Sequence, residues 1–159
     1  MECVFVRHGE ASWEAATDAE RSLTPAGEAH ARAAARWLSE HWQPNLILVS
    51  PYRRAQQTAA EFLGCYSGVS RKNHPSLTPD SSLQKLEQAI DDAGVERLLL
   101  IGHNPLFSNS ISWFCGDDMR EVMAPASLAL IELPVVCRDA GRLRWLRHAP
   151  DYSQIASCQ

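Results

Sequence analysis

Short apolar runs alternate with segments of helical periodicity along the first two thirds of the chain. The runs cover residues 4–6, 46–49 and 98–101, and each ends at a polar or turn-forming residue. An apolar run with such an ending is typical of a strand that is buried on both faces of a sheet. The pattern therefore predicts three buried strands.

Helices are predicted between these strands. A capping threonine followed by a proline opens the first helix, at residues 24–42, and apolar residues recur along it at helical spacing. Ser50-Pro51 repeats the same signal, so we expect Ser50 to cap a second helix. Arg53 and Arg54 then lie in the first turn of that helix, where cations oppose the helix dipole. This placement suggests that an anion binds beside them.

Later segments contain one predicted loop and two further predicted helices. Residues 64–79 are rich in glycine, serine and proline, which predicts a surface loop. Residues 83–93 have helical periodicity, and Gly94 follows as a stop signal. The third apolar run leads into Asn104-Pro105, which we expect to start a fourth helix.

The C-terminal part of the chain has a different pattern. Residues 128–133 and 143–146 are strand-like and are joined through a turn at 139–141, which predicts a hairpin. Three strand-then-helix units followed by two strands predict an α/β fold, with a mainly parallel sheet and antiparallel C-terminal strands. No repeat or linker divides the chain, so we expect residues 1–159 to form a single domain.

Composition and charge narrow the possible partners and compartment. The 159 residues are 45% hydrophobic and carry a formal net charge of -4, which argues against a general nucleic-acid or membrane binder. No basic, apolar leader opens the chain, and no apolar run approaches the length of a membrane span, so we expect a cytoplasmic protein. The five cysteines are scattered, without a Cys-x-x-Cys pair, and predict reduced, mostly buried thiols.

Reactive side chains follow all three predicted strands. Arg7 and His8 come directly after the first strand, Arg54 lies just beyond the second, and His103 lies just beyond the third. Because the carboxyl ends of parallel strands meet at one edge of a sheet, we expect these side chains to converge there. Two imidazoles and several guanidiniums around one space suggest a site for a phosphoryl group.

The order of these segments resembles the histidine phosphatase superfamily, also called the phosphoglycerate mutase-like superfamily. Within it, the short chain and the segment Arg21-Ser22-Leu23-Thr24-Pro25-x-Gly27 look most like the SixA-type phosphohistidine phosphatases. The resemblance implies a three-layer α/β/α sandwich. The three matching blocks are Arg7-His8-Gly9, Ser50-Pro51-x-x-Arg54-Ala55-x-x-Thr58 and Gly102-His103.

The resemblance also implies a role for each site residue. His8 would be the nucleophile, forming a phosphohistidine intermediate that water then hydrolyses, and its other ring nitrogen should donate to a backbone carbonyl. Arg7 and Arg54 would bind the phosphoryl oxygens, and His103 would donate a further hydrogen bond. Arg21 is expected near the rim of the pocket as an additional substrate-binding residue. These groups position and neutralise a phosphoryl group by themselves, so no metal and no cofactor is expected.

A general acid is harder to predict. Relatives that cleave phosphate esters use a Glu or Asp to protonate the leaving alkoxide, and the candidates here are Asp80, Glu10 and Asp18. An imidazole leaving group is much less basic than an alkoxide, so a weak acid favours phosphohistidine over sugar phosphates as the substrate. The short chain leaves little material for a lid, which suits a phosphate presented on another protein.

We therefore expect a metal-independent phosphohistidine protein phosphatase, and a histidine-containing phosphotransfer domain of a phosphorelay is its expected partner. It would work in signal transduction, as a monomer, without nucleic acid or membrane. Two alternatives remain open at this point. One is a general or small-molecule phosphomonoesterase of the same superfamily, and the other is a phosphoprotein-binding module without turnover.

Overall fold

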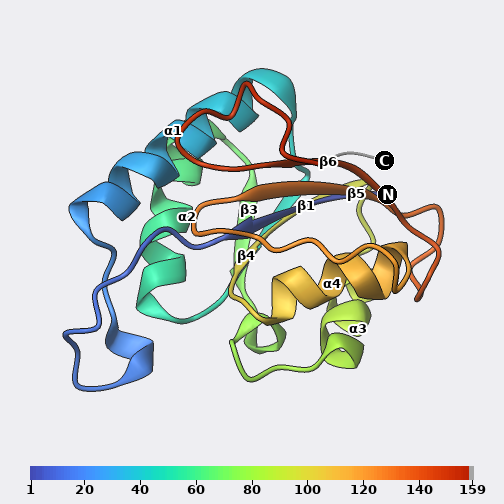
Figure 1. Cartoon of the computed structure of the whole chain (residues 1–159), viewed down its shortest axis with the longest axis horizontal. Helices are drawn as coiled ribbons and strands as arrows, with labels where there is room; N and C mark the ends of the chain where they lie inside the picture. The colour runs from blue at the N-terminus through green and yellow to red at the C-terminus, as the bar shows by residue number, and fades with distance from the viewer. Residues whose placement is uncertain (158–159) are drawn as a thin grey trace.

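A six-stranded sheet with helices on both faces makes up the molecule, and the computed structural model describes residues 1–157 (Figure 1). The strands are β1 (Glu2–Arg7), β2 (Leu46–Val49), β3 (Ser70–Asn73), β4 (Arg97–Gly102), β5 (Leu128–Glu132) and β6 (Arg142–Arg147). Their order across the sheet is β3-β2-β4-β1-β5-β6. The first four are parallel, and β5 is antiparallel to both of its neighbours. The predicted α/β fold with antiparallel C-terminal strands is confirmed.

The helices form a layer on each face of the sheet, so the three-layer prediction is also confirmed. They are α1 (Pro25–His41), α2 (Arg53–Cys65), α3 (Leu83–Ala93) and α4 (Leu106–Cys115). Successive residues of a strand point to opposite faces. Val4 and Val6 of β1 accordingly pack in the cluster that includes α1 and α2, whereas Phe5 packs in the cluster that includes α3 and α4. None of the helices within residues 1–157 is long and apolar enough to cross a bilayer.

Two local signals act as the sequence predicts. The Thr24 hydroxyl accepts a hydrogen bond from the backbone N–H of Gly27 at 3.0 Å, so Thr24 caps α1. α3 ends at Gly94, whose φ of 60° lies in the left-handed region that glycine adopts without strain. The start of α1 and the end of α3 therefore lie where the local sequence predicts them.

The prediction of a loop over residues 64–79 is wrong. α2 continues to Cys65, β3 occupies Ser70–Asn73, and a short 3₁₀ helix follows at Pro75–Leu77. β3 is the outer strand of the sheet and its side chains are mostly exposed, so its sequence shows no apolar pattern. It becomes a strand because its backbone pairs with β2, which a local pattern cannot reveal.

Ser50 does not cap α2, contrary to the prediction. The helix begins at Arg53, and Tyr52 stands at the capping position without a side-chain hydrogen bond. The Ser50 hydroxyl is directed elsewhere, to a buried histidine described below. The cap-then-proline signal is therefore present in the sequence, but a tertiary contact takes its hydroxyl.

The cysteine prediction is partly wrong. The four described cysteines are free thiols, and Cys158 lies outside the described residues. Cys3 is buried and Cys115 is partly buried, but Cys65 and Cys137 are exposed. Two of the four described thiols are therefore exposed, where mostly buried thiols were predicted.

Candidate active site

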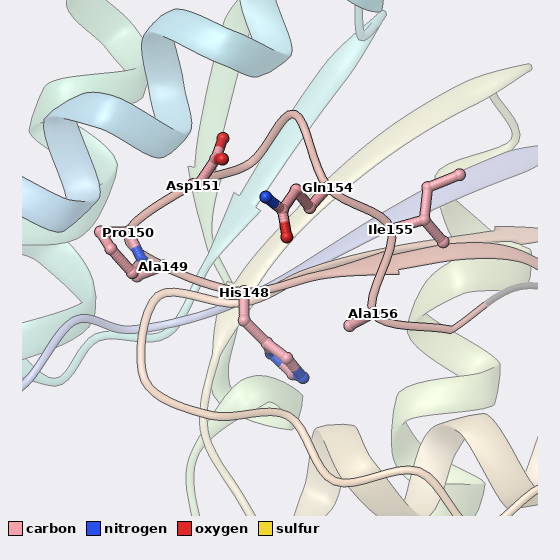
Figure 2. Close-up of a pocket in the computed structure, with 7 residues that line it drawn as sticks. All are labelled: His148, Ala149, Pro150, Asp151, Gln154, Ile155 and Ala156. Atoms are coloured by element: carbon pink, nitrogen blue, oxygen red, sulfur yellow. The ribbon is translucent and has the colours of Figure 1, made fainter.

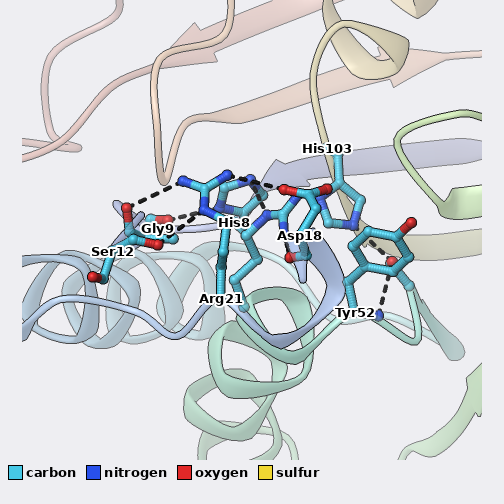
Figure 3. Close-up of polar contacts among 10 residues, drawn as sticks. His8, Gly9, Ser12, Asp18, Arg21, Tyr52 and His103 are labelled. Carbon is cyan, nitrogen blue, oxygen red and sulfur yellow. Dashed lines mark hydrogen bonds and ion pairs between the residues drawn. The ribbon is translucent and has the colours of Figure 1, made fainter. Parts of the chain in front are cut away.

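The carboxyl ends of β2, β4 and β1 lie side by side at one edge of the sheet. His8 follows β1, His103 follows β4, and Arg54 lies in the first turn of the helix after β2. The backbone N–H of His8 donates to the Gly102 carbonyl at 2.9 Å, so β1 and β4 stay paired up to the point where these side chains emerge. The two imidazole rings are 5.0 Å apart between centroids, and Figure 3 shows them beside Asp18.

His8 is 7% exposed, and its contacts leave it in one tautomer. Nδ1 lies 2.7 Å from the carbonyl oxygen of Gly9, which can only accept, so Nδ1 carries the proton. Nε2 therefore has a free lone pair, and it accepts from Nε of Arg54 at 3.2 Å. Burial lowers the pKa of His8 to about 3, and the nearby Arg54 and Arg7 act in the same direction, so the ring is neutral at pH 7.

Two glycines bring the His8 segment against the start of α1. A Cβ on Gly9 would lie 2.6 Å from the carbonyl oxygen of Gly27, and a Cβ on Gly27 would lie 2.1 Å from that of Glu10. The backbone N–H of Gly9 also donates to the Thr58 hydroxyl of α2 at 3.1 Å. Backbone contact with one helix and a hydrogen bond to another thus hold the Gly9 carbonyl that orients His8.

Arg54 connects His8 with the segment that follows β1. Its side chain is buried, and besides His8 it binds Asp18, donating to the backbone carbonyl at 2.6 Å and to carboxylate Oδ2 at 3.2 Å. All three nitrogens of the guanidinium therefore have partners. A carboxylate already occupies the outer side of this guanidinium, which marks that side as an anion position.

Arg7 precedes His8 at the end of β1 and has a spare donor. Its NH1 donates to the Met123 carbonyl at 2.8 Å, and its buried Nε has no partner among the described residues. Burial lowers the pKa of Arg7, with Arg54 adding to the effect, although an arginine stays charged at neutral pH. An unpaired buried donor is costly in the free protein, and an oxyanion would satisfy it.

His103 is completely buried and neutral. Burial lowers its pKa to about 2, and the neighbouring His8 and Arg54 lower it further. Nε2 lies 2.7 Å from the Ser50 hydroxyl, and buried Nδ1 has no partner among the described residues. The structure thus brings Arg7, His8, Arg54 and His103 together, each linked to a different part of the scaffold.

Arg21 lies at the rim of the site, and its guanidinium nitrogens already have hydrogen-bond partners. It donates to the carbonyls of Ser12 and Ala11 at 2.9 and 3.2 Å, and its NH1 lies 3.3 Å from Asp18 Oδ1. The Trp13 ring, which is 82% exposed, stacks on the guanidinium with the centroid 3.5 Å from Cζ. Arg21 therefore braces the segment around Asp18 as well as contributing positive charge to the site.

Of the three candidate acids, only Asp18 forms a hydrogen bond with a predicted site residue among residues 1–157. Glu10 accepts from the Thr24 hydroxyl at 3.0 Å, and Asp80 is exposed. Partial burial acts to raise the pKa of Asp18, but hydrogen bonds from Arg54 and Arg21 outweigh it and hold that pKa below its ordinary value. Asp18 is ionised at neutral pH.

Nowhere in residues 1–157 do three metal-binding side chains cluster.

Sequence reasoning missed three groups that position the site. Thr58 was given no role of its own, Ser50 was expected to cap a helix, and the Met123 carbonyl gave no signal at all. Ser50 and Thr58 both belong to the second matching block, so their hydroxyl groups could have suggested a polar role. The carbonyl of Met123 could not, because backbone acceptors look alike in a sequence.

A separate pocket of about 240 Å³ lies between the end of β6 and the C-terminal segment (Figure 2). It is lined by His148, Ala149, Pro150, Asp151, Gln154, Ile155 and Ala156. Figure 2 shows the His148 ring pointing away from Asp151 and Gln154, and its Nδ1 is paired with the buried Ser127 hydroxyl. None of the predicted site residues lines this pocket.

The arrangement around His8 suits a phosphoryl group, and the chain belongs to the histidine phosphatase superfamily. Residues 3–77 match the family model of the histidine phosphatase superfamily, branch 1. The phosphohistidine phosphatase SixA of Escherichia coli (strain K12) is 31% identical over 138 residues, which cover 84% of this chain and 86% of that protein. The resemblance inferred from the three sequence blocks is confirmed.

Two further relatives agree with this family. A SixA homolog of Haemophilus influenzae is 29% identical over 146 residues, covering 81% of this chain and 86% of that protein. A solved structure of the protein histidine phosphatase SixA complexed with tungstate superposes with a TM-score of 0.81 at 29% identity. It covers 92% of this chain and 96% of its own.

Proposed function

We propose that this protein is a phosphohistidine phosphatase that works through a covalent phosphohistidine on His8. The observation that carries the proposal is the state of His8: a buried, neutral imidazole with its proton on Nδ1 and its Nε2 lone pair beside two guanidiniums. A neutral nitrogen next to cations is a nucleophile placed where a phosphate dianion is attracted.

The reaction would proceed in two displacements at phosphorus. In the first, Nε2 of His8 forms a bond to phosphorus while the bond to the substrate imidazole nitrogen breaks, and that nitrogen takes up a proton from solvent water. In the second, water attacks the phosphohistidine, the bond to Nε2 breaks, and phosphate leaves while the proton that the attacking water loses returns to the solvent. Arg54 must release its hydrogen bond to Nε2 before the first step, and its Nε–H then becomes available to a phosphoryl oxygen.

Charge neutralisation would come from the groups around His8. Arg7 has an unpaired buried Nε and His103 an unpaired buried Nδ1 among the described residues, so both can contact phosphoryl oxygens without giving up another bond. Arg54 would contribute by exchanging Asp18 for the phosphoryl group. The complex of a SixA protein with tungstate supports binding of a phosphoryl group by this family, because tungstate is a tetrahedral oxyanion like phosphate.

The proposed substrate is a phosphorylated histidine on a phosphotransfer domain of a phosphorelay. We propose that this protein acts on it in the cytoplasm, as a monomer. The relatives of this chain are phosphohistidine phosphatases by name, which supports the class of phosphoryl bond. Asp18 is the candidate acid that is hydrogen-bonded to Arg54, and because it is ionised it has no proton to donate. An imidazole leaving group depends less on such a donor than an alkoxide does, and we propose that Asp18 lies beside the leaving imidazole while that group takes its proton from water.

The decisive experiment compares substrates on the intact protein. We expect hydrolysis of a phosphorylated histidine phosphotransfer domain with a kcat/KM at least about 100-fold above that for sugar phosphates. His8→Ala should abolish turnover, whereas His30→Ala, a histidine on α1 outside the site, should leave it unchanged. Rapid hydrolysis of sugar phosphates with no action on the phosphoprotein would favour the small-molecule alternative. Binding without turnover would favour the phosphoprotein-binding module.

A further inference from the structure

Ser50 is completely buried and is held in place by its backbone and its side chain. Its backbone N–H donates to the Ile101 carbonyl at 3.0 Å, and its carbonyl accepts from Nε2 of Gln56 at 2.7 Å. These bonds place its hydroxyl 2.7 Å from Nε2 of His103. A hydroxyl fixed in this way at a buried imidazole can decide where the ring proton resides.

The direction of this hydrogen bond is indicated by the acceptors that surround the hydroxyl. The backbone N–H of Tyr52 donates to Ser50 Oγ at 3.3 Å, so one lone pair of the oxygen is already used. Within residues 1–157 the only acceptor in hydrogen-bonding contact with this hydroxyl is His103 Nε2. If Nε2 donated instead, to the second lone pair of the oxygen, the buried hydroxyl proton would have no acceptor among these residues. Donation from Ser50 to Nε2 avoids that loss, and Nε2 is then the unprotonated nitrogen of a neutral ring.

The other ring nitrogen is the one the site needs. Nδ1 of His103 is buried and has no partner among the described residues, and Figure 3 shows the ring beside His8 and Asp18 on one side and Tyr52 on the other. A protonated Nδ1 would donate to a phosphoryl oxygen, whereas a bare lone pair would repel it. Because burial keeps His103 neutral, the ring has only one proton to place.

We propose that Ser50 is a positioning residue: its hydroxyl donates to Nε2 of His103 and so keeps the ring proton on Nδ1, ready for a phosphoryl oxygen. His8 and His103 then share one tautomer but present opposite atoms. His8 offers a lone pair on Nε2, and His103 offers a proton on Nδ1. The inference rests on the proposed function for its phosphoryl ligand, but not for the tautomer itself.

The first test reads the tautomer directly in the wild-type protein. Nitrogen-15 NMR of histidine-labelled protein at pH 7, with His103 assigned by the loss of its signals in His103→Gln, distinguishes a protonated Nδ1 from a protonated Nε2. We expect Nδ1 to be protonated. Protonation of Nε2 would overturn the inference whatever the activity of the protein. A protonated Nδ1 without phosphohistidine hydrolysis would instead remove the proposed function and leave the tautomer assignment standing.

The second test removes the hydroxyl. Ser50→Ala should shift the His103 signals away from a single Nδ1–H tautomer and lower kcat/KM for the phosphoprotein by about 10- to 100-fold. Ser50→Thr retains a hydroxyl and should recover most of the loss. The matched control is Ser110→Ala, which removes another fully buried hydroxyl, one bonded to the Leu106 carbonyl in α4. Unchanged His103 signals and unchanged kcat/KM in Ser50→Ala would contradict the role.

Discussion

At the scale of single residues, the site combines a buried and a half-buried arginine with neutral imidazoles. Arg54 is 3% exposed and donates to a nitrogen of His8, and the pKa of His8 is lowered to about 3 mainly by burial. A phosphate dianion that enters this space is attracted by two guanidiniums, while the nucleophilic nitrogen of His8 stays unprotonated. Binding charge and nucleophilic nitrogen therefore come from different residues.

Replacing Arg54 with lysine tests the geometry of this guanidinium. Arg54→Lys keeps the charge but cannot contact His8 and a phosphoryl group with a planar set of donors, so we expect kcat/KM to fall by about 100-fold. The control is Arg53→Lys on the same helical turn, because the Arg53 side chain donates to the Glu20 carbonyl rather than to His8. Steady-state kinetics with the phosphoprotein measure the two losses. An unchanged kcat/KM in Arg54→Lys would show that charge alone matters, and similar losses in both variants would contradict a specific role for the Arg54 guanidinium.

Asp18 competes with the ligand for Arg54, which gives a prediction for binding. Asp18→Asn removes a carboxylate that accepts from Arg54 and Arg21, so inorganic phosphate should bind about 10-fold more tightly, or about 1.4 kcal/mol. Isothermal titration calorimetry measures this, with Asp80→Asn as the exposed control. Weaker binding in Asp18→Asn would mean that Asp18 chiefly holds Arg54 in position.

At the scale of elements, the site depends on how closely α1 approaches the end of β1. Two glycine backbones meet there, and each leaves no room for a Cβ. The sequence shows Gly27 within the segment that opens α1, but nothing local says that this glycine faces another one. The distance between the helix and the strand was therefore decided by packing.

Gly27→Ala tests this contact. The added methyl group would lie 2.1 Å from the Glu10 carbonyl oxygen, so the helix must move, and we expect the free energy of unfolding to fall by about 2–3 kcal/mol. Gly64→Ala in α2 is the control, because the space that its methyl group would enter is open and alanine favours the helix. Urea denaturation should show the opposite sign in the two variants. Equal small effects would contradict the tight contact.

At the scale of the whole molecule, burying neutral histidines makes stability depend on pH. The folded pKa values of His8 and His103, about 3 and about 2, lie below the ordinary value of 6.5. The unfolded chain therefore binds more protons below pH 6.5, and stability is lost as pH falls from there toward the folded values. Acid therefore weakens this fold through these two histidines.

We expect the free energy of unfolding to fall by about 1 kcal/mol for each of these two histidines between pH 7 and pH 5.5. His103→Gln should remove its share of the pH dependence, whatever its effect on stability at pH 7. Urea denaturation of both proteins at the two pH values measures this. An equal pH dependence in wild type and variant would mean that His103 is not buried as a neutral ring.

The sequence by itself determined the buried strands, most helices and the candidate site residues at the strand ends. Residues 46–49 and 98–101 read as strands because burial on both faces makes a local run apolar, and Arg7, His8, Arg54 and His103 follow from that placement. The exposed side chains of β3 carry no such pattern. That strand exists because a sheet edge offers backbone partners, which only the folded chain provides.

The tertiary structure alone decided how the site residues are held. It placed the Gly9 carbonyl against His8, the Asp18 carboxylate against Arg54 and the Ser50 hydroxyl against His103. Ser50 and His103 are 53 residues apart in the chain, and the Ser50 hydroxyl had an equally good local use as a helix cap. Hydrogen bonds between distant segments depend on distances of a few tenths of an ångström, and only packing of the sheet and helices sets those distances.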